Sequence, residues 1–115
     1  MLLVQRGKPL GFRRWSLPGG KLEASETPLD AAIRELWEET QVVAHLLHAV
    51  GEFVVEGPDA RFVIDCFTGD YVSGMATAGD DAMAVAWVNH AAIQTYDLAP
   101  NIAEAVFMAR DLIKL

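Results

Sequence analysis

The sequence predicts a single α/β domain of the α+β sandwich kind, in which a β-sheet is flanked by helices. Two segments, residues 28–40 and the stretch from residue 100 onward, place apolar side chains at helical spacing. Several other segments are rich in Val, Ile and Phe and bounded by turn residues, as strands are. The 115 residues suffice for one hydrophobic core and not for two. No repeat, linker or low-complexity run interrupts them, so residues 1–115 are expected to form one domain.

The composition is that of a globular protein, with 52% hydrophobic and 22% charged residues. Its longest apolar runs, such as Ala82–Val88, are too short to cross a bilayer, and the first residues do not resemble a signal peptide. Cys66 is the only cysteine, which excludes an intrachain disulfide and predicts a reducing, cytoplasmic setting. A formal charge of −7 argues against nucleic acid or an anionic membrane as a partner.

Four strands are expected from residue type and spacing. Leu2–Gln5 is the first, and residues 50–56 and 61–67 form a hairpin around the turn Gly57-Pro58-Asp59. Residues 84–88 form the last strand, after a Gly-rich, acidic loop over residues 73–81.

The strongest helix signal covers residues 28–40. Thr27 is a suitable N-cap, Pro28 fits the first helical position, and Asp30 places a negative charge in the first turn. One face of this helix is expected to pack on the sheet, namely that of Leu29, Ala32, Ile33, Leu36 and Thr40. A second helix is expected to open at Pro100, with an apolar stripe at Ile102, Val106, Ala109 and Leu112 or Ile113.

Acidic residues are concentrated on and just before the first helix. Glu35, Glu38 and Glu39 stand at i, i+3 and i+4, so their side chains converge on one patch at the rim of the core. Such a patch is either a solvated acidic face or a site for a hard divalent cation such as Mg²⁺. Lysines four residues away would favour the solvated face, but the helix has Arg34 as its only base. The residues alone leave both interpretations open.

A longer pattern around this patch resembles the Nudix box. Gly20, Glu26 and the run Arg34-Glu35-Leu36-Trp37-Glu38-Glu39 follow its spacing over residues 20–42, and residues 15–23 match the usual lead-in. The resemblance implies a Nudix-type mixed β-sheet flanked by helices. It also implies a hydrolase that cleaves a pyrophosphate in a nucleoside diphosphate linked to another group, with Mg²⁺ or Mn²⁺ as its cofactor.

The resemblance also implies roles for individual residues. The metal ligands would be Glu35, Glu38, Glu39 and the backbone carbonyl of Gly20. Arg34 would pair with a box glutamate and hold it in place, and Glu26 would brace the segment. Glu35 or Glu38 would be the base that deprotonates water.

In other relatives the base comes from a later loop. Asp80 and Asp81 are the candidates here, although both also fit an ordinary polar loop tip. Arg6, at the end of the first strand, is the candidate for contacting the phosphates of a substrate; it could equally balance the acidic surface.

The sequence departs from the family pattern in two places. Gln41 replaces the glycine that follows the glutamate pair, which is expected to cost about 1 kcal/mol or to shift the helix end. A strand that usually precedes the one at Leu2–Gln5 is missing, which is expected to expose a sheet edge. A homodimer partner could cover such an edge; a start placed too late in the sequence would also account for it.

The group attached to the nucleoside diphosphate is not fixed by the box. Pro58, sixteen positions after Val42, resembles a marker of ADP-ribose hydrolases, although a hairpin proline needs no other reason. The segment 78–88 also resembles short ADP-ribose-type members, which favours ADP-ribose or a similar nucleoside diphosphate sugar. The alternatives are a nucleoside triphosphate pyrophosphohydrolase that cleanses the nucleotide pool, and a Nudix-fold module that binds a nucleotide without turnover.

Overall fold

Three strands from distant parts of the chain form an antiparallel sheet in the computed structural model. The structure describes residues 1–7, 12–19, 22–56 and 61–113. The sheet has the order β2–β1–β5, with β1 at Leu2–Arg6, β2 at Trp15–Ser16 and β5 at Ala82–Trp87. β1 is therefore the middle strand, hydrogen-bonded on both sides. Among the described residues, the edges of this sheet are formed by the two-residue strand β2 and by β5, and the homodimer stays a prediction.

A long hairpin forms a second sheet. Strand β3 covers Val43–Glu56 and β4 covers Arg61–Ser73, so both strands are longer than the periodicity predicted. The register shifts at three places along the pair, and these irregularities hid the first half of β3 from a search for strict alternation. The predicted turn at Gly57-Pro58-Asp59 lies outside the described residues. The α+β class is confirmed, with the strands divided between two antiparallel sheets.

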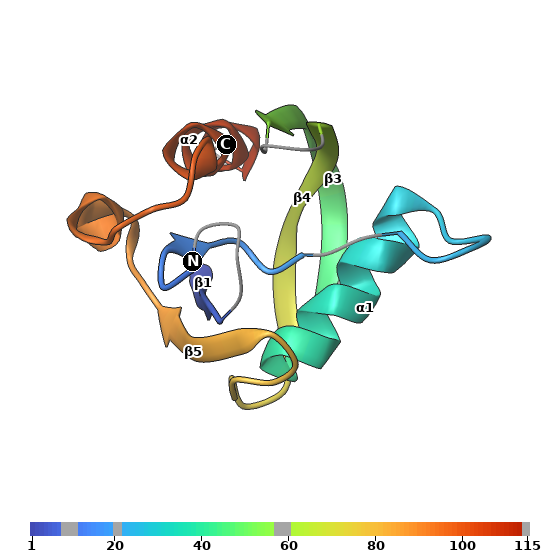
Figure 1. Cartoon of the computed structure of the whole chain (residues 1–115), viewed down its shortest axis with the longest axis horizontal. Helices are drawn as coiled ribbons and strands as arrows, with labels where there is room; N and C mark the ends of the chain where they lie inside the picture. The colour runs from blue at the N-terminus through green and yellow to red at the C-terminus, as the bar shows by residue number, and fades with distance from the viewer. Residues whose placement is uncertain (8–11, 20–21, 57–60, 114–115) are drawn as a thin grey trace.

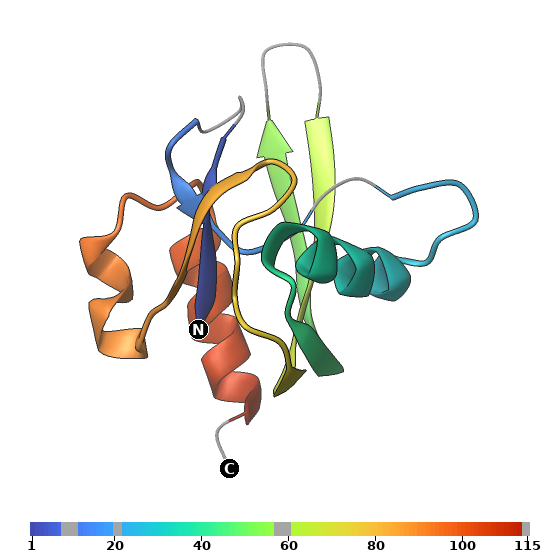
Figure 2. The same cartoon turned by 90° about the horizontal axis from the view of Figure 1, so that it is seen from below.

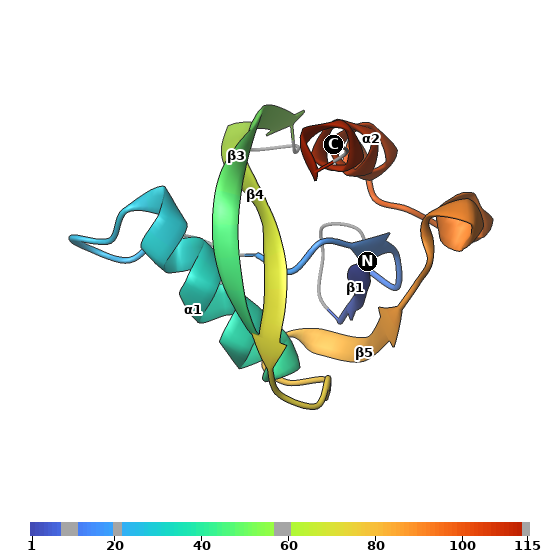
Figure 3. The same cartoon turned by 180° about the vertical axis from the view of Figure 1, so that it is seen from behind.

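Helices lie on both sides of the β3–β4 hairpin. Helix α1, Pro28–Thr40, packs against one side and α2, Ile102–Ile113, against the other, as opposite views show (Figures 1 and 3). Helix α2 begins two residues after Pro100, where it was expected to open, because Asn101 has a left-handed backbone and the helix starts after it. No helix within the described ranges is long and apolar enough to cross a membrane.

The main hydrophobic core lies between the three-stranded sheet and the C-terminal part of the chain. Leu3, Val88, Ile93 and Val106 form its buried centre. Ile93 belongs to a 3₁₀ helix, η1, at His90–Thr95, which the periodicity did not predict. Asn89 is the N-cap of η1, and its side chain accepts a hydrogen bond from the Ala92 N–H. In Figure 2, η1 and α2 follow β5 and lie beside the strands that they cover.

Helix α1 buries only part of the predicted face: Thr40 is fully buried and Ala32 and Leu36 are half-buried, but the other two members are exposed. Leu29 and Ile33 are 38% and 44% exposed, whereas the buried residues of the helix are Ala31, Glu35, Glu39 and Thr40. The reason lies in the backbone that crosses the helix end. The carbonyls of Glu39 and Thr40 accept hydrogen bonds from the N–H groups of Gly79 and Thr77, which fixes the rotation of the helix with its carboxylates inward.

Candidate metal centre on helix α1

Both ends of helix α1 are fixed by local interactions. At the start, the Thr27 side chain accepts a hydrogen bond from the Asp30 N–H at 3.1 Å, and Pro28 occupies the first turn, as predicted. At the end, Gln41 has φ 59° and ψ 24°, and its N–H donates to the Trp37 carbonyl. The departure from the box glycine has therefore left the helix end unmoved, with a side chain held in the left-handed region.

The carboxylates of α1 differ in exposure because they occupy different faces of the helix. Glu35 is 8% exposed and Glu39 is 7% exposed, whereas Glu38 is half-buried. Ala31, Glu35 and Glu39 are spaced four residues apart and form the inward stripe. The prediction of partly shielded carboxylates is confirmed, and two of the three lie deeper than the rim of the core.

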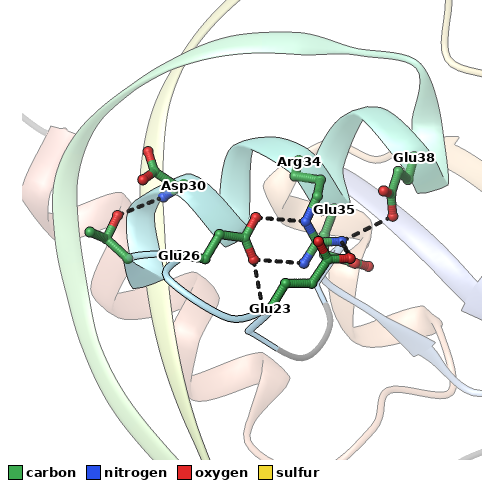
Figure 4. A network of polar contacts seen from close by, with 7 residues as sticks. Glu23, Glu26, Asp30, Arg34, Glu35 and Glu38 are labelled. Carbon is green, nitrogen blue, oxygen red and sulfur yellow. Dashed lines mark hydrogen bonds and ion pairs between the residues drawn. The ribbon is translucent and has the colours of Figure 1, made fainter.

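Arg34 is the centre of a network of ion pairs (Figure 4). Its Nε and Nη2 donate to the two oxygens of Glu26 at 2.7 and 3.0 Å, and its Nη1 donates to Glu35 and, at 3.1 Å, to Glu38. A fourth carboxylate, that of Glu23, lies 3.7 Å from Nη1. Glu26 and Arg34 thus form a forked ion pair, and the bracing role of Glu26 stays a prediction that this contact supports.

The environment shifts the pKa values of these acids in opposite directions. Hydrogen bonds from Arg34 and from the Glu23 N–H lower the pKa of Glu26. Burial raises the pKa of Glu35, against the opposing effect of Arg34. Burial likewise raises the pKa of Glu39 to about 7, partly offset by the Gly19 N–H, which donates to its Oε1 at 2.8 Å. Buried acids with raised pKa values need either protons or a cation.

A residue from a distant loop completes the acidic group. One oxygen from each of Glu35, Glu38 and Asp80 lies within 4.8 Å of the other two, and the charge of Asp80 raises the pKa values of both Glu35 and Glu39. Of the two loop acids that the sequence offered, the structure brings Asp80 to the group. The carboxylate of Asp81 is not a member of that group among the described residues.

The other predicted site residues differ in how they lie relative to the acidic group. Arg6 lies close enough to Glu39 for its charge to lower the pKa of that carboxyl, so it is near the acidic group. Glu39 is adjacent to the group, but its Oε1 is engaged by Gly19. Gly20, predicted to offer its carbonyl to the metal, lies outside the described residues. Sequence reasoning had no signal that separated Asp80 from Asp81, because the choice depends on the tight turn, Gly79 to Ala82, that contains both.

Comparison with known proteins shows the family. The sequence matches the family described as "NUDIX domain" over residues 1–108, and the chain belongs to that family. The oxidized purine nucleoside triphosphate hydrolase of Mus musculus is 33% identical over 103 residues, which cover 88% of this chain and 65% of that protein. The chain thus spans slightly less than two thirds of this relative.

Solved structures share the fold. The NUDIX domain of Shewanella oneidensis NrtR, complexed with ADP ribose, is 24% identical and has a TM-score of 0.84, covering 98% of this chain and 77% of that one. A bifunctional NMN adenylyltransferase/ADP ribose pyrophosphatase from Francisella tularensis, complexed with AMP and a manganese ion, is 29% identical with a TM-score of 0.70. That comparison covers 96% of this chain and 37% of the other.

The donor set at α1 fits a hard divalent cation. Carboxylate oxygens are the ligands that Mg²⁺ and Mn²⁺ prefer, and at least three converge here. Their like charges are compensated only in part by Arg34, and burial disfavours the charged forms of Glu35 and Glu39. A bound cation would relieve both costs.

Proposed function

We propose that this protein is a Mg²⁺-dependent hydrolase that cleaves the pyrophosphate bond of a nucleoside diphosphate linked to another group. The observation that carries the proposal is the convergence of carboxylate oxygens from Glu35 and Glu38, on the Nudix-box helix, and from Asp80, in the turn before β5. Glu35, Glu38, Glu39 and the carbonyl of Gly20 remain the proposed metal ligands, with Asp80 added to them. When bound there, the metal would polarise phosphate oxygens and lower the pKa of a coordinated water.

The residues of the chain then have distinct tasks. Glu35 or Glu38 accepts the proton of the attacking water, since both carboxylates point into the acidic group. Arg34 orients these two side chains through Nη1 while its other nitrogens remain on Glu26. Arg6, whose charge lowers the pKa of Glu39, would supply positive charge to the phosphates of a substrate.

For the substrate we propose ADP-ribose or a similar nucleoside diphosphate sugar. The support is the resemblance of residues 78–88 to ADP-ribose-type members and the likeness to the Francisella tularensis bifunctional protein, whose name includes ADP ribose pyrophosphatase. Pro58, the other sequence marker, lies outside the described residues. A second candidate is a nucleoside triphosphate, because the Mus musculus relative acts on oxidized purine nucleoside triphosphates by its name.

Product analysis separates the two substrate classes. The purified protein would be incubated with ADP-ribose, NADH, the common nucleoside triphosphates and 8-oxo-dGTP, each with Mg²⁺, with Mn²⁺ and with EDTA. AMP and ribose 5-phosphate would identify the diphosphate-sugar activity, whereas a nucleoside monophosphate and pyrophosphate would identify the triphosphate activity.

Two matched variants test the site. Glu38→Gln is expected to lower turnover by about 100-fold or more, as loss of a catalytic acid or base does. Glu104→Gln removes the same charge from an exposed position on α2 and is expected to keep wild-type turnover. A folded wild-type protein that binds nucleotide and hydrolyses none of the substrates would refute the enzyme in favour of a binding module.

A further inference from the structure

A tight turn carries Asp80 to the acidic group. The turn closes with a hydrogen bond of 3.0 Å from the Ala82 N–H to the Gly79 carbonyl, immediately before β5. Asp80 itself has φ 49°, a left-handed conformation that aspartate adopts more readily than most residues. The position of its carboxylate therefore depends on where the turn is held, and not on an element of regular structure.

One attachment of the turn is to the end of helix α1. The Gly79 N–H donates to the Glu39 carbonyl at 2.9 Å, using a carbonyl that the helix leaves without an internal partner. A Cβ atom on residue 79 would lie 2.6 Å from the carbonyl oxygen of Glu38. Both neighbours are backbone atoms of the helix that bears the other carboxylates. Any larger residue at 79 must move the turn away from Glu35 and Glu38.

The other attachment is to the end of strand β1. The Gly7 N–H donates to the Asp81 carbonyl at 2.8 Å. A Cβ atom on residue 7 would lie 2.8 Å from that same carbonyl oxygen and 3.0 Å from Cγ of Met83. Gly7 follows Arg6, the residue whose charge acts on Glu39, so the turn is fixed between the acidic helix and the strand that brings this cation.

We propose that Gly79 and Gly7 are positioning residues, which hold Asp80 in the carboxylate group by allowing close backbone contact on both sides of its turn. The proposal rests on the proposed function of that group as a metal centre. The requirement at both positions is space, since neither glycine has a backbone conformation in the left-handed region. With a side chain at either position, the turn shifts and Asp80 is displaced from its place beside Glu35 and Glu38.

Metal affinity tests the proposal without reference to turnover. Mn²⁺ binding would be measured by calorimetry on the wild type, Gly79→Ala, Asp80→Asn and the double variant. Each single substitution is expected to weaken Mn²⁺ binding about 10- to 100-fold, the usual effect of disturbing a supporting residue of a metal site. The double variant is expected to bind no more weakly than Asp80→Asn alone, since Gly79 acts through Asp80.

The double-variant comparison distinguishes positioning from a general loss of structure. If Gly79→Ala weakens binding by the same factor with and without the Asp80 carboxylate, or leaves Mn²⁺ affinity unchanged, the proposal is overturned. The same comparison is made with Gly7→Ala, alone and combined with Asp80→Asn, which disturbs the turn from its other side. If the circular dichroism spectrum shows that Gly79→Ala does not fold like the wild type, the Gly7→Ala comparison is the one that tests the proposal.

The outcome is separable from that of the proposed function. A wild type that binds no Mn²⁺ would overturn the positioning proposal. Mn²⁺ binding with the expected coupling, in a protein that hydrolyses none of the substrates, would support the positioning proposal and refute the enzyme. Hydrolysis by the wild type, with unchanged Mn²⁺ affinity in both glycine variants, would support the enzyme and overturn the positioning proposal.

Discussion

Arg34 holds both carboxylate oxygens of Glu26, through Nε at 2.7 Å and Nη2 at 3.0 Å. Glu26 is in turn tied to its own loop, because its Oε1 accepts the Glu23 N–H at 2.9 Å and its N–H donates to the Glu23 carbonyl at 3.1 Å. The forked pair therefore fastens the loop before α1 to the middle of that helix. It leaves Nη1 to reach the two carboxylates of the candidate metal centre.

This geometry predicts that lysine cannot replace Arg34. Lysine keeps the charge but has a single nitrogen, so it cannot hold both Glu26 oxygens and reach Glu38 at once. We expect Arg34→Lys to lower the melting temperature and to weaken Mn²⁺ binding about 10- to 100-fold. The exposed Arg110 on α2 offers a matched control, since Arg110→Lys should change neither quantity. Wild-type Mn²⁺ affinity in Arg34→Lys would mean that charge alone is required at this position.

The strained end of α1 predicts a stabilising substitution. Gln41 holds φ 59°, a conformation that glycine adopts without steric cost. Gln41→Gly is expected to raise the free energy of unfolding by up to about 1 kcal/mol, measured by urea denaturation. Ala32→Gly, inside the same helix, is expected to lower it by about the same amount. If both substitutions changed the free energy of unfolding in the same direction, the left-handed backbone of Gln41 would not be a source of strain.

The buried Glu39 predicts an unusual dependence of stability on pH in the metal-free protein. Its folded-state pKa of about 7 lies above the ordinary value of 4.5, so folding favours the protonated form. The stabilising contribution is complete below pH 4.5 and is lost as the pH rises toward 7. Because one pKa unit corresponds to about 1.4 kcal/mol, the total is roughly 3 to 4 kcal/mol at most.

Urea denaturation in EDTA between pH 4.5 and 8 would measure this loss. Glu39→Gln, which cannot ionise, is expected to show a flatter profile than the wild type over this range. The slope that remains would include Glu35, whose pKa is also raised by burial. Identical slopes in the two proteins would show that Glu39 is charged in the folded state without a metal.

Local signals in the sequence predicted the elements that local interactions determine. Thr27 and Pro28 gave the start of α1, and the box spacing gave the three carboxylates of the helix. The predicted inward face of α1 was correct at Thr40 and wrong at Leu29 and Ile33, which are exposed. Two of the carboxylates lie deeper than the rim position that was predicted for them. Burial of Glu35 and Glu39 depends on Arg34, Gly19 and the loop that crosses the helix end. None of these tertiary contacts is expressed in helical periodicity.

The third member of the acidic group shows the same limit. Asp80 and Asp81 are adjacent acids in one polar loop, and no periodic pattern separates them. The turn that closes between Gly79 and Ala82 sends the Asp80 carboxylate toward Glu35 and Glu38 and the Asp81 carbonyl toward Gly7. A sequence reveals that such a loop is acidic and rich in glycine; the direction of each side chain follows from backbone contacts with α1 and β1.

This division between neighbours predicts different effects for two identical substitutions. Asp80→Asn removes a carboxylate from the acidic group and is expected to weaken Mn²⁺ binding about 10- to 100-fold. Asp81→Asn keeps the backbone carbonyl that accepts the Gly7 N–H, so the turn remains attached to β1. We therefore expect it to change Mn²⁺ affinity by no more than about a factor of two, the range of a substitution that spares the buried network. Calorimetry on both variants at one pH makes the comparison. If Asp81→Asn weakened binding as much as Asp80→Asn, the metal centre would have to draw on both loop acids, and the turn would act as a two-carboxylate arm.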